Sequence, residues 1–399
     1  MEMIFRVARL TGGCSWSRRL VGLLVGLSIL AAAIVEGAEQ AARPKLSRGF
    51  SYRNDRVEEV PWSIHIVQIE RGNPDFELHT MLAKGTAFGM STVSEQIKAL
   101  PPELGRPIAA INGDFFRNER TPYQGDPTGL QILQGELVSG PCERSCFWID
   151  AAGNPHMTNV LSQFKITWPD GGETPFGLNE ERSKDGAVLY SSALGASTHA
   201  AGGRELILER DGDDEWLPLR AGKTYHGRVR EVRDNGDTPL TNDIVVLSLG
   251  PQLVAQLQKV EAGAVLGIST ATIPDLGGAN TAIGGGPALV RNGKPMEWHN
   301  MQMRHPRTAI GWNSHYFFLV EVDGRQRNLS VGMTFPELAS YMAKLGCDEA
   351  LNLDGGGSAT YWVYGQVVNS PSEGRERPDG NSLVVVRKEK PAKRSAKPE

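Results

Sequence analysis

The sequence predicts an α+β fold with a strand-rich mixed-sheet core, few helices and a single main domain. Short segments in which apolar and polar residues alternate recur along the chain, as strands require, and turn-forming residues separate them. Segments with helical spacing of apolar residues are few. The 46 glycines among 399 residues have no fixed period, so they indicate tight turns and loops and not a fibrous repeat.

The strand predictions begin after an irregular lead-in over residues 39–60. Single strands are predicted at Trp62–Ile69, Pro107–Ile111, Asp243–Leu249, Tyr316–Val322 and Ala350–Leu353. Hairpins are predicted over Thr128–Val138, with a turn at Gln134-Gly135, over Ala288–Arg291 with the turn Asn292-Gly293, and over Tyr361–Val368. The middle of the chain, residues 151–275, has several further short strand candidates and no internal repeat.

Two helices are predicted. Ser91–Leu100 has helical spacing and is followed by a pair of prolines that end it. Thr334–Leu345 carries one apolar face, and its Thr334 and Glu337 form a capping-box pattern. Gly346 follows at the position where a C-terminal glycine is favoured.

The two ends of the chain are predicted to lie outside the fold. Residues 1–38 combine several arginines with an apolar run from Leu20 to Val35 and small residues after it, the arrangement of a secretory signal peptide. A permanent membrane anchor is the alternative. Residues 388–399 are basic, lack an apolar face and are expected to be disordered. Between them we predict a strand-rich N-terminal segment over 39–104, packed on a main domain over 105–387.

Export is consistent with the cysteines and the charge. Cys142 and Cys146 could close a small disulfide loop in an oxidising compartment, whereas Cys347 is expected to be a buried free thiol. Without its ends the chain is acidic, which argues against nucleic acid as a partner. The basic tail could contact the cell envelope or a membrane surface. The predicted location is therefore the periplasm or the exterior.

Four polar clusters stand next to short apolar strands. They are Asn112-Gly113-Asp114, Gly284-Gly285-Gly286-Pro287, His305-Pro306-Arg307-Thr308 and Asp354-Gly355-Gly356-Gly357-Ser358. A carboxylate at a strand end is held by a rigid scaffold and can still reach solvent. Three glycines after it allow a sharp turn whose successive N–H groups can bind an anion. The alternative is a plain tight turn in which the aspartate accepts local hydrogen bonds.

The other clusters offer supporting groups. Arg307 has paired donors that match phosphate oxygens, although alone it could equally form a surface ion pair. Asp114 is a second carboxylate candidate, or a turn residue. Asn112 could donate to a sugar or a phosphate, or tolerate a left-handed backbone. His305 is expected at the edge of a site, and two histidines near each other do not make a metal site.

Six segments together resemble the phosphodiester glycosidase family, which contains the lysosomal uncovering enzyme and bacterial exopolysaccharide-associated proteins. They are Ala110–Phe116, Pro127–Gly129, Ile283–Pro287, His305–Gly311, Asp323–Arg325 and Ala350–Thr360. The resemblance covers about 105–387. One departure is Asp114, where the family is expected to have a small residue.

The resemblance implies a hydrolase that cleaves a sugar from an anomeric sugar-1-phosphodiester. It implies Asp354 at the anomeric centre, with Arg307 and the 355–357 amides on the phosphate, and Asp114 is our choice for a second carboxylate. The predicted substrate-binding residues are Asn112, Gly285, Gly286, His305, Thr308, Gly355, Gly356, Gly357 and Ser358.

Two other functions remain open at this point. A non-catalytic protein of the same fold that binds a polysaccharide or the cell wall would account for the basic tail. A metal-dependent phosphodiesterase that attacks phosphorus is disfavoured by the few histidines. No cofactor is predicted to be required, although Mg²⁺ or Ca²⁺ could bind oxygen ligands near Asp114 or Asp354.

Overall fold

The computed structural model describes residues 48–257 and 259–388. The predicted signal segment and the tail beyond Lys388 lie outside the described residues. Residues 48–399 belong to one compact unit. Among the described residues, no helix is both long and apolar enough to span a membrane.

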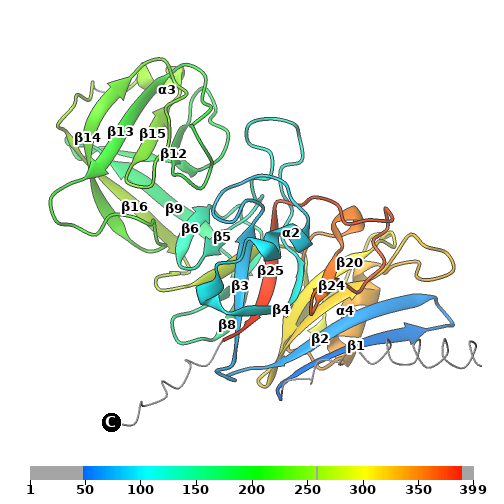
Figure 1. Ribbon diagram of the computed structural model, residues 1–399. Helices are drawn as coiled ribbons and strands as arrows, with labels where there is room; N and C mark the ends of the chain where they lie inside the picture. The colour runs from blue at the N-terminus through cyan, green and yellow to red at the C-terminus, as the bar shows by residue number, and fades with distance from the viewer. Residues whose placement is uncertain (1–47, 258, 389–399) are drawn as a thin grey trace, which may run out of the picture. The chain divides into compact units, whose positions relative to one another are not determined.

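A seven-stranded antiparallel sheet combines strands from the N-terminal part of the chain with strands from its last third (Figure 1). Its spatial order is β1 (Phe50–Val57), β2 (Trp62–Glu70), β21 (Tyr316–Val322), β20 (Arg307–Trp312), β22 (Glu349–Asn352), β18 (Ala288–Arg291) and β19 (Lys294–Pro295). Helix α4 (Phe335–Lys344) packs on one face, and its apolar residues join one core cluster with Ala309 and Ala350.

A five-stranded sheet packs against the other face. Its order is β24 (Gln366–Val367), β23 (Tyr361–Val363), β4 (Arg106–Asn112), β25 (Asn381–Arg387) and β3 (Phe76–Leu82). A core cluster joins Ile111 and Leu383 of this sheet to Ile310 and Leu351 of the first. Helix α2 (Val93–Lys98) covers the outer face, and the 3₁₀ turn η1 (Pro102–Leu104) follows it.

Two more sheets complete the described chain. A five-stranded sheet has the order β6 (Glu136–Ser139), β5 (Gln131–Leu133), β17 (Thr281–Gly284), β7 (Ser145–Ile149), β8 (Pro155–Asn159). An eight-stranded sheet has the order β10 (Glu173–Pro175), β9 (Leu161–Thr167), β16 (Val265–Ile273), β14 (Thr224–Arg233), β13 (Arg204–Arg210), β15 (Val245–Leu249), β12 (Ala187–Tyr190), β11 (Gly177–Leu178). The short helix α3 (Pro251–Val254) follows β15. Only the β11–β12 pair is parallel within the described chain.

The predicted fold class is confirmed. Strands dominate, and the described residues contain three α-helices. The capping box at Thr334 and Glu337 is present, because each side chain accepts a hydrogen bond from the other residue's backbone N–H. The turn at Gln134-Gly135 has two left-handed residues, φ 51° and 84°, as a two-residue hairpin turn requires.

One expectation was wrong, and the question of a Cys142–Cys146 disulfide is answered. The lead-in over 39–60 is not irregular throughout, because Phe50–Val57 forms β1 along the whole of β2. As an edge strand β1 exposes mostly polar side chains, so its alternation is weak in sequence. Cys142 and Cys146 are free thiols, and the buried Cys146 donates to the Thr158 carbonyl at 3.4 Å. Cys347 is a buried free thiol, as predicted.

Candidate functional site

Asn112, the last residue of β4, joins three of the predicted clusters. Its Nδ2 donates to the Asp354 carbonyl at 2.9 Å. Its Oδ1 accepts from the Thr308 hydroxyl at 2.6 Å and from the Thr360 amide at 3.2 Å. The Asp354 amide in turn donates to the Gly113 carbonyl at 2.9 Å. The structure therefore brings Asn112, Thr308 and Asp354 together across two sheets, and both polar atoms of the Asn112 side chain contact protein groups.

Asp354 is held within its own loop and also faces an arginine that sequence analysis did not select. Its Oδ1 accepts from the Gly355 amide at 2.7 Å, and its Oδ2 accepts from the Ser358 hydroxyl at 2.6 Å. Arg377 Nη2 lies 3.6 Å from Oδ2 and also donates to the Ser358 hydroxyl. The Asp354 side chain is 16% exposed. Burial raises the pKa of Asp354, and these hydrogen bonds and arginines oppose that rise.

Asp114 is a second carboxylate at the same place. Its Oδ2 accepts from the Gly129 amide at 2.9 Å, and Arg144 Nη2 lies 4.0 Å from Oδ1. Burial raises the pKa of Asp114 to about 7, against the lowering effects of Arg144 and the neighbouring amides, and the Asp354 charge raises it further. Such a group can exchange a proton near neutral pH.

Asp379 is a third carboxylate, and it was missed. Arg377 Nε lies 3.6 Å from its Oδ1, so Arg377 stands between Asp354 and Asp379. Burial raises the pKa of Asp379 to about 8, and the Asp354 charge contributes. The sequence contained a pattern that could have identified Asp379. Asp379-Gly380 stands directly before the buried strand β25, just as each of the four selected clusters stands next to a short apolar strand. We call Asp114, Asp354, Asp379, Arg144 and Arg377 the carboxylate corner.

The glycines of the Gly284–Gly286 segment make room for this arrangement. A Cβ on Gly284 would lie 2.1 Å from Asp114 Oδ2, and one on Gly285 would lie 2.6 Å from the Asn352 carbonyl. The Gly286 amide donates to that same carbonyl at 2.7 Å. Gly285 and Gly286, predicted to bind substrate, therefore lie in close contact with the backbone of β22.

The structure does not bring the Arg307 side chain to Asp354. Thr308 and Arg307 are consecutive on β20, so they point to opposite faces of the sheet. Thr308 faces Asn112, whereas the Arg307 guanidinium donates to the carbonyls of Met303 and Met333 at 3.1 and 3.0 Å. It also lies 3.9 Å above the Phe335 ring. In the described chain Arg377, and not Arg307, forms the ion pair with Asp354. The phosphate-binding role of Arg307 stays a prediction.

The predicted anion-binding amides are also largely occupied. The Gly355 amide donates to Asp354 Oδ1, and the Gly356 amide donates to the Pro306 carbonyl at 2.9 Å. Of the amides of residues 355–357, this leaves Gly357 for a ligand. Gly357 is buried, and a Cβ there would lie 2.2 Å from Glu373 Oε1. The glycines thus serve mainly to pack the turn η2 (Gly356–Ser358) tightly.

His305 lies beside an exposed arginine at the outer side of this loop. Arg325 Nη2 is 3.3 Å from His305 Nδ1, and a Cβ on Gly356 would lie 3.0 Å from Arg325 Nη2. Desolvation first, and then Arg307 and Arg325, lower the pKa of His305. A neutral His305 and a cationic Arg325 therefore border the glycine loop.

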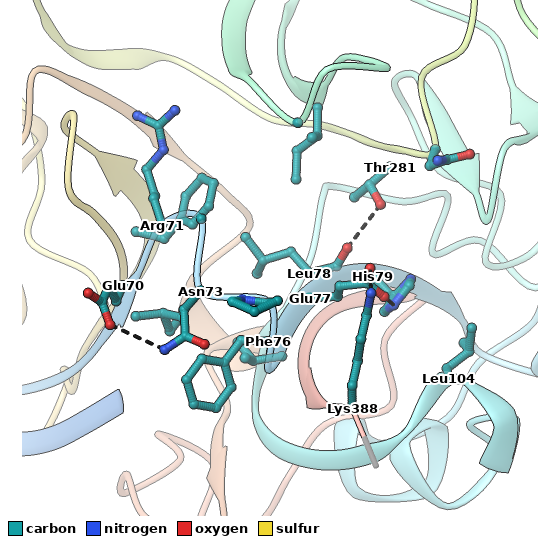
Figure 2. A pocket seen from close by; sticks show the side chains of 18 of the residues that line it. Glu70, Arg71, Asn73, Phe76, Glu77, Leu78, His79, Leu104, Thr281 and Lys388 are labelled. Atoms are coloured by element: carbon teal, nitrogen blue, oxygen red, sulfur yellow. Dashed lines mark hydrogen bonds and ion pairs between the residues drawn. The ribbon is translucent and has the colours of Figure 1, made fainter. Parts of the chain in front are cut away.

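An open cavity of about 470 Å³ lies elsewhere (Figure 2). It is lined by charged and aromatic side chains, among them Arg71, Phe76, His79, Phe317 and Lys388. None of its lining residues belongs to the predicted site or to the carboxylate corner. The cavity and the carboxylate corner are thus separate features of the fold.

Comparison with known proteins finds a family model that is similar to the C-terminal part of the chain. Residues 221–386 match the model of the phosphodiester glycosidase family, NAGPA. This range includes Arg307, Asp354 and Arg377, whereas Asn112 and Asp114 precede it. The SPbeta prophage-derived protein YomE of Bacillus subtilis strain 168 is 35% identical over 114 residues, which cover 27% of this chain and 18% of YomE. The chain thus spans less than a fifth of that relative.

Solved structures share the fold over most of the chain. A hypothetical protein from Synechocystis matches with a TM-score of 0.66 at 20% identity. The match covers 85% of this chain and 62% of the Synechocystis chain. A protein of Burkholderia pseudomallei K96243, described as a candidate exported protein, has a TM-score of 0.62 at 24% identity, with coverages of 82% and 74%. The zebrafish NAGPA catalytic domain, auto-inhibited by its pro-peptide, has a TM-score of 0.42 at 15% identity, with coverages of 85% and 82%.

Proposed function

We propose that the protein is an exported hydrolase of sugar-1-phosphodiesters, because residues 221–386 match the model of the phosphodiester glycosidase family. It would release the sugar of a glycan or cell-envelope polymer from its anomeric phosphate. The observation that carries the proposal is the carboxylate corner, where the buried Asp114 and Asp379 and the partly buried Asp354 lie beside two arginines. Groups with such displaced pKa values cluster where catalysis occurs.

The reaction needs little general-acid catalysis at the oxygen of the leaving phosphate, because a phosphate monoester is a good leaving group. The bond between the anomeric carbon and the phosphate oxygen breaks, and the phosphate leaves with the electron pair. Asp354 acts at the anomeric carbon, as nucleophile or as base for water. Asp114, with its pKa of about 7, exchanges the proton with water.

The growing charge on the phosphate is assigned to two arginines. Arg377 already contacts Asp354 and Ser358, and Arg325 borders Gly356 from the outer side. Preorganised cations stabilise developing negative charge strongly where water is partly excluded. We assign this role to them instead of Arg307, because two of the Arg307 donors are bonded to the carbonyls of Met303 and Met333. The proposed reaction requires no cofactor.

Hydrolysis in ¹⁸O-labelled water tests the reaction. The purified protein is incubated with a panel of alkyl esters of sugar 1-phosphates, and mass spectrometry measures the ¹⁸O content of the sugar and of the phosphate product. Label in the sugar is the expected result. Label in the phosphate would instead mean attack on phosphorus, and it would exclude the proposed chemistry.

A non-catalytic protein that binds a polysaccharide or the cell wall is the second candidate. The open cavity with Arg71, Lys388 and two phenylalanine rings favours it, because such groups suit acidic and stacked sugars. Calorimetric binding of an envelope polysaccharide with no product released would support it against the hydrolase. N-terminal sequencing of protein recovered outside the cytoplasm tests export, and cleavage near residue 38 is expected.

A further inference from the structure

A histidine and two carboxylates lie together on the seven-stranded sheet, where His65 of β2 pairs with Glu321 of β21, away from the carboxylate corner. His65 of β2, Glu321 of β21 and Asp323 just after β21 place one ligand atom each within 4.8 Å of the others. Their exposed fractions are 3%, 0% and 1%. We call these three residues the His65 cluster. Two carboxylates buried this deeply must be neutralised, either by a cation or by a proton.

The protein itself supplies no such cation. Neither carboxylate oxygen of Glu321 has a hydrogen-bond partner of normal geometry within the described chain. No lysine or arginine forms an ion pair with Glu321 or Asp323 in residues 48–257 and 259–388, and the only charged contact is that of Asp323 Oδ2 with His65 Nε2 at 3.1 Å. Glu321 is therefore a fully buried acid with no cation beside it, and its polar neighbours include the Asn369 side chain.

The surroundings of His65 favour a ligand role for its Nε2. Nδ1 faces the Tyr52 hydroxyl at 2.9 Å, and Nε2 lies 3.2 Å from Asn54 Nδ2, which is a donor. A ring that donates from Nδ1 to Tyr52 leaves Nε2 unprotonated, which is the form that binds a metal. The unprotonated Nε2 and Asp323 Oδ2 are 3.1 Å apart, a separation that suits two neighbouring ligands of one metal ion.

The remaining contacts act as supports of the kind seen around metal ligands. Asp323 Oδ1 accepts from the Ser370 amide at 2.7 Å, which fixes the carboxylate and leaves Oδ2 for the ion. Ser63 Oγ lies 3.3 Å from His65 Nε2. Outer-shell hydrogen bonds of this type orient the residues that bind a metal.

We propose that His65, Glu321 and Asp323 bind one divalent transition-metal ion of the Zn²⁺ or Mn²⁺ class, which stabilises the fold by joining β2 to β21. One imidazole nitrogen with carboxylate oxygens is a donor set that such ions take. Calcium requires six to eight oxygen ligands, and magnesium retains several waters. A dry cluster with a nitrogen ligand suits neither. A serine hydroxyl or the second oxygen of Glu321 is available to complete the coordination.

Metal analysis of the full chain tests this proposal. The protein is purified without a histidine tag, and its metals are counted by plasma mass spectrometry. Close to one transition-metal ion per chain is expected. Refolding in the presence of a chelator should lower Tm by about 5 °C or more, and added Zn²⁺ or Mn²⁺ should restore it. Calcium or magnesium alone would overturn the proposed class.

Two variants locate the ion. Glu321→Gln keeps the shape of the side chain and should lose the metal and the response of Tm to chelation. His226→Asn is the matched control, because His226 is an exposed histidine that pairs with Asp214 at 3.0 Å; it should retain both. A metal-free wild-type protein whose Tm ignores added Zn²⁺ and Mn²⁺ would overturn the proposal, since the two acids would then share a proton. The wild-type measurement decides even if Glu321→Gln fails to fold.

Discussion

The carboxylate corner and the His65 cluster both bury several acids, but different groups balance their charge. At the corner, Arg144 and Arg377 approach the acids and keep 34% and 32% of their side chains exposed. The His65 cluster has no arginine or lysine within ion-pair distance in the described chain. All three of its side chains are less than 4% exposed.

This difference separates a place for exchange from a place for permanent binding. The side chains of these arginines are partly exposed and can change partners. An incoming phosphate can therefore accept the hydrogen bonds that Arg377 otherwise donates toward Asp354 and Ser358. A fully buried histidine with two acids offers no such route. Whatever neutralises the cluster is expected to be bound during folding and to remain. The two regions therefore call for different experiments, one on rate and one on stability.

The largest effect is expected from Asp354→Asn. Loss of the carboxylate at the anomeric carbon should lower kcat by about 10³-fold or more, while the circular dichroism spectrum and Tm remain close to wild type. Asp348→Asn is the matched control, since Asp348 is an exposed aspartate just before β22. Release of sugar from a sugar-1-phosphodiester at near wild-type rate by Asp354→Asn would remove the corner from catalysis.

Arg377→Ala and Arg307→Ala should separate the two arginines. We expect Arg377→Ala to lower kcat/KM by about 10²-fold, because it removes the cation beside Asp354 and Ser358. Arg307→Ala should mainly lower Tm, because it leaves the Met303 and Met333 carbonyls without their donor. The measurements are steady-state kinetics and thermal unfolding on both variants. The reverse result would restore Arg307 as the phosphate-binding residue.

This pair of arginines also shows how far sequence reasoning reaches. Asn112 and Asp354 were predictable, because each stands at the end of a short apolar strand that fixes its position. The direction of Arg307 was harder, since one step along a strand reverses the face. The polar Thr308 turned out to be the residue that faces Asn112.

Contacts between loop residues that are far apart in the sequence could not be predicted from it. Arg144 follows a left-handed residue, Glu143, in the loop before β7, and it meets Asp114 from a different sheet. Arg377 belongs to the loop before β25 and reaches back to Asp354. Nothing in local spacing links such positions. The fold class was predictable because alternation is local, whereas the acid–arginine contacts depend on how four sheets are joined.

The pH dependence of stability should show the burial of Asp114. Its pKa is raised from 3.8 to about 7 on folding, so the folded protein holds a proton that the unfolded chain releases. Stability should therefore fall as pH rises from about 4 to about 7. In Asp114→Asn this slope should be smaller by up to about 1.4 kcal/mol per pH unit. Urea unfolding at several pH values measures it.

Asp379, whose pKa of about 8 has the same cause, should leave a remaining slope of the same sign in Asp114→Asn. Identical pH profiles for the wild type and Asp114→Asn would show that Asp114 is ionised in the folded protein. That outcome would place the corner nearer to an ordinary buried ion pair with Arg144.

The smallest effect is expected from Gly284→Ala, which tests whether the two regions are independent. A Cβ there would press on Asp114 Oδ2 at 2.1 Å, at a cost of about 1–3 kcal/mol in unfolding free energy. Gly140→Ala is the control, since its Cβ would meet only Phe164, at 3.4 Å. Gly284→Ala should change the pH profile and the rate through Asp114, yet leave the metal content at the His65 cluster unchanged. If metal content falls together with the rate, the two groups of acids form one coupled system, and the contrast between exchange and permanent binding fails.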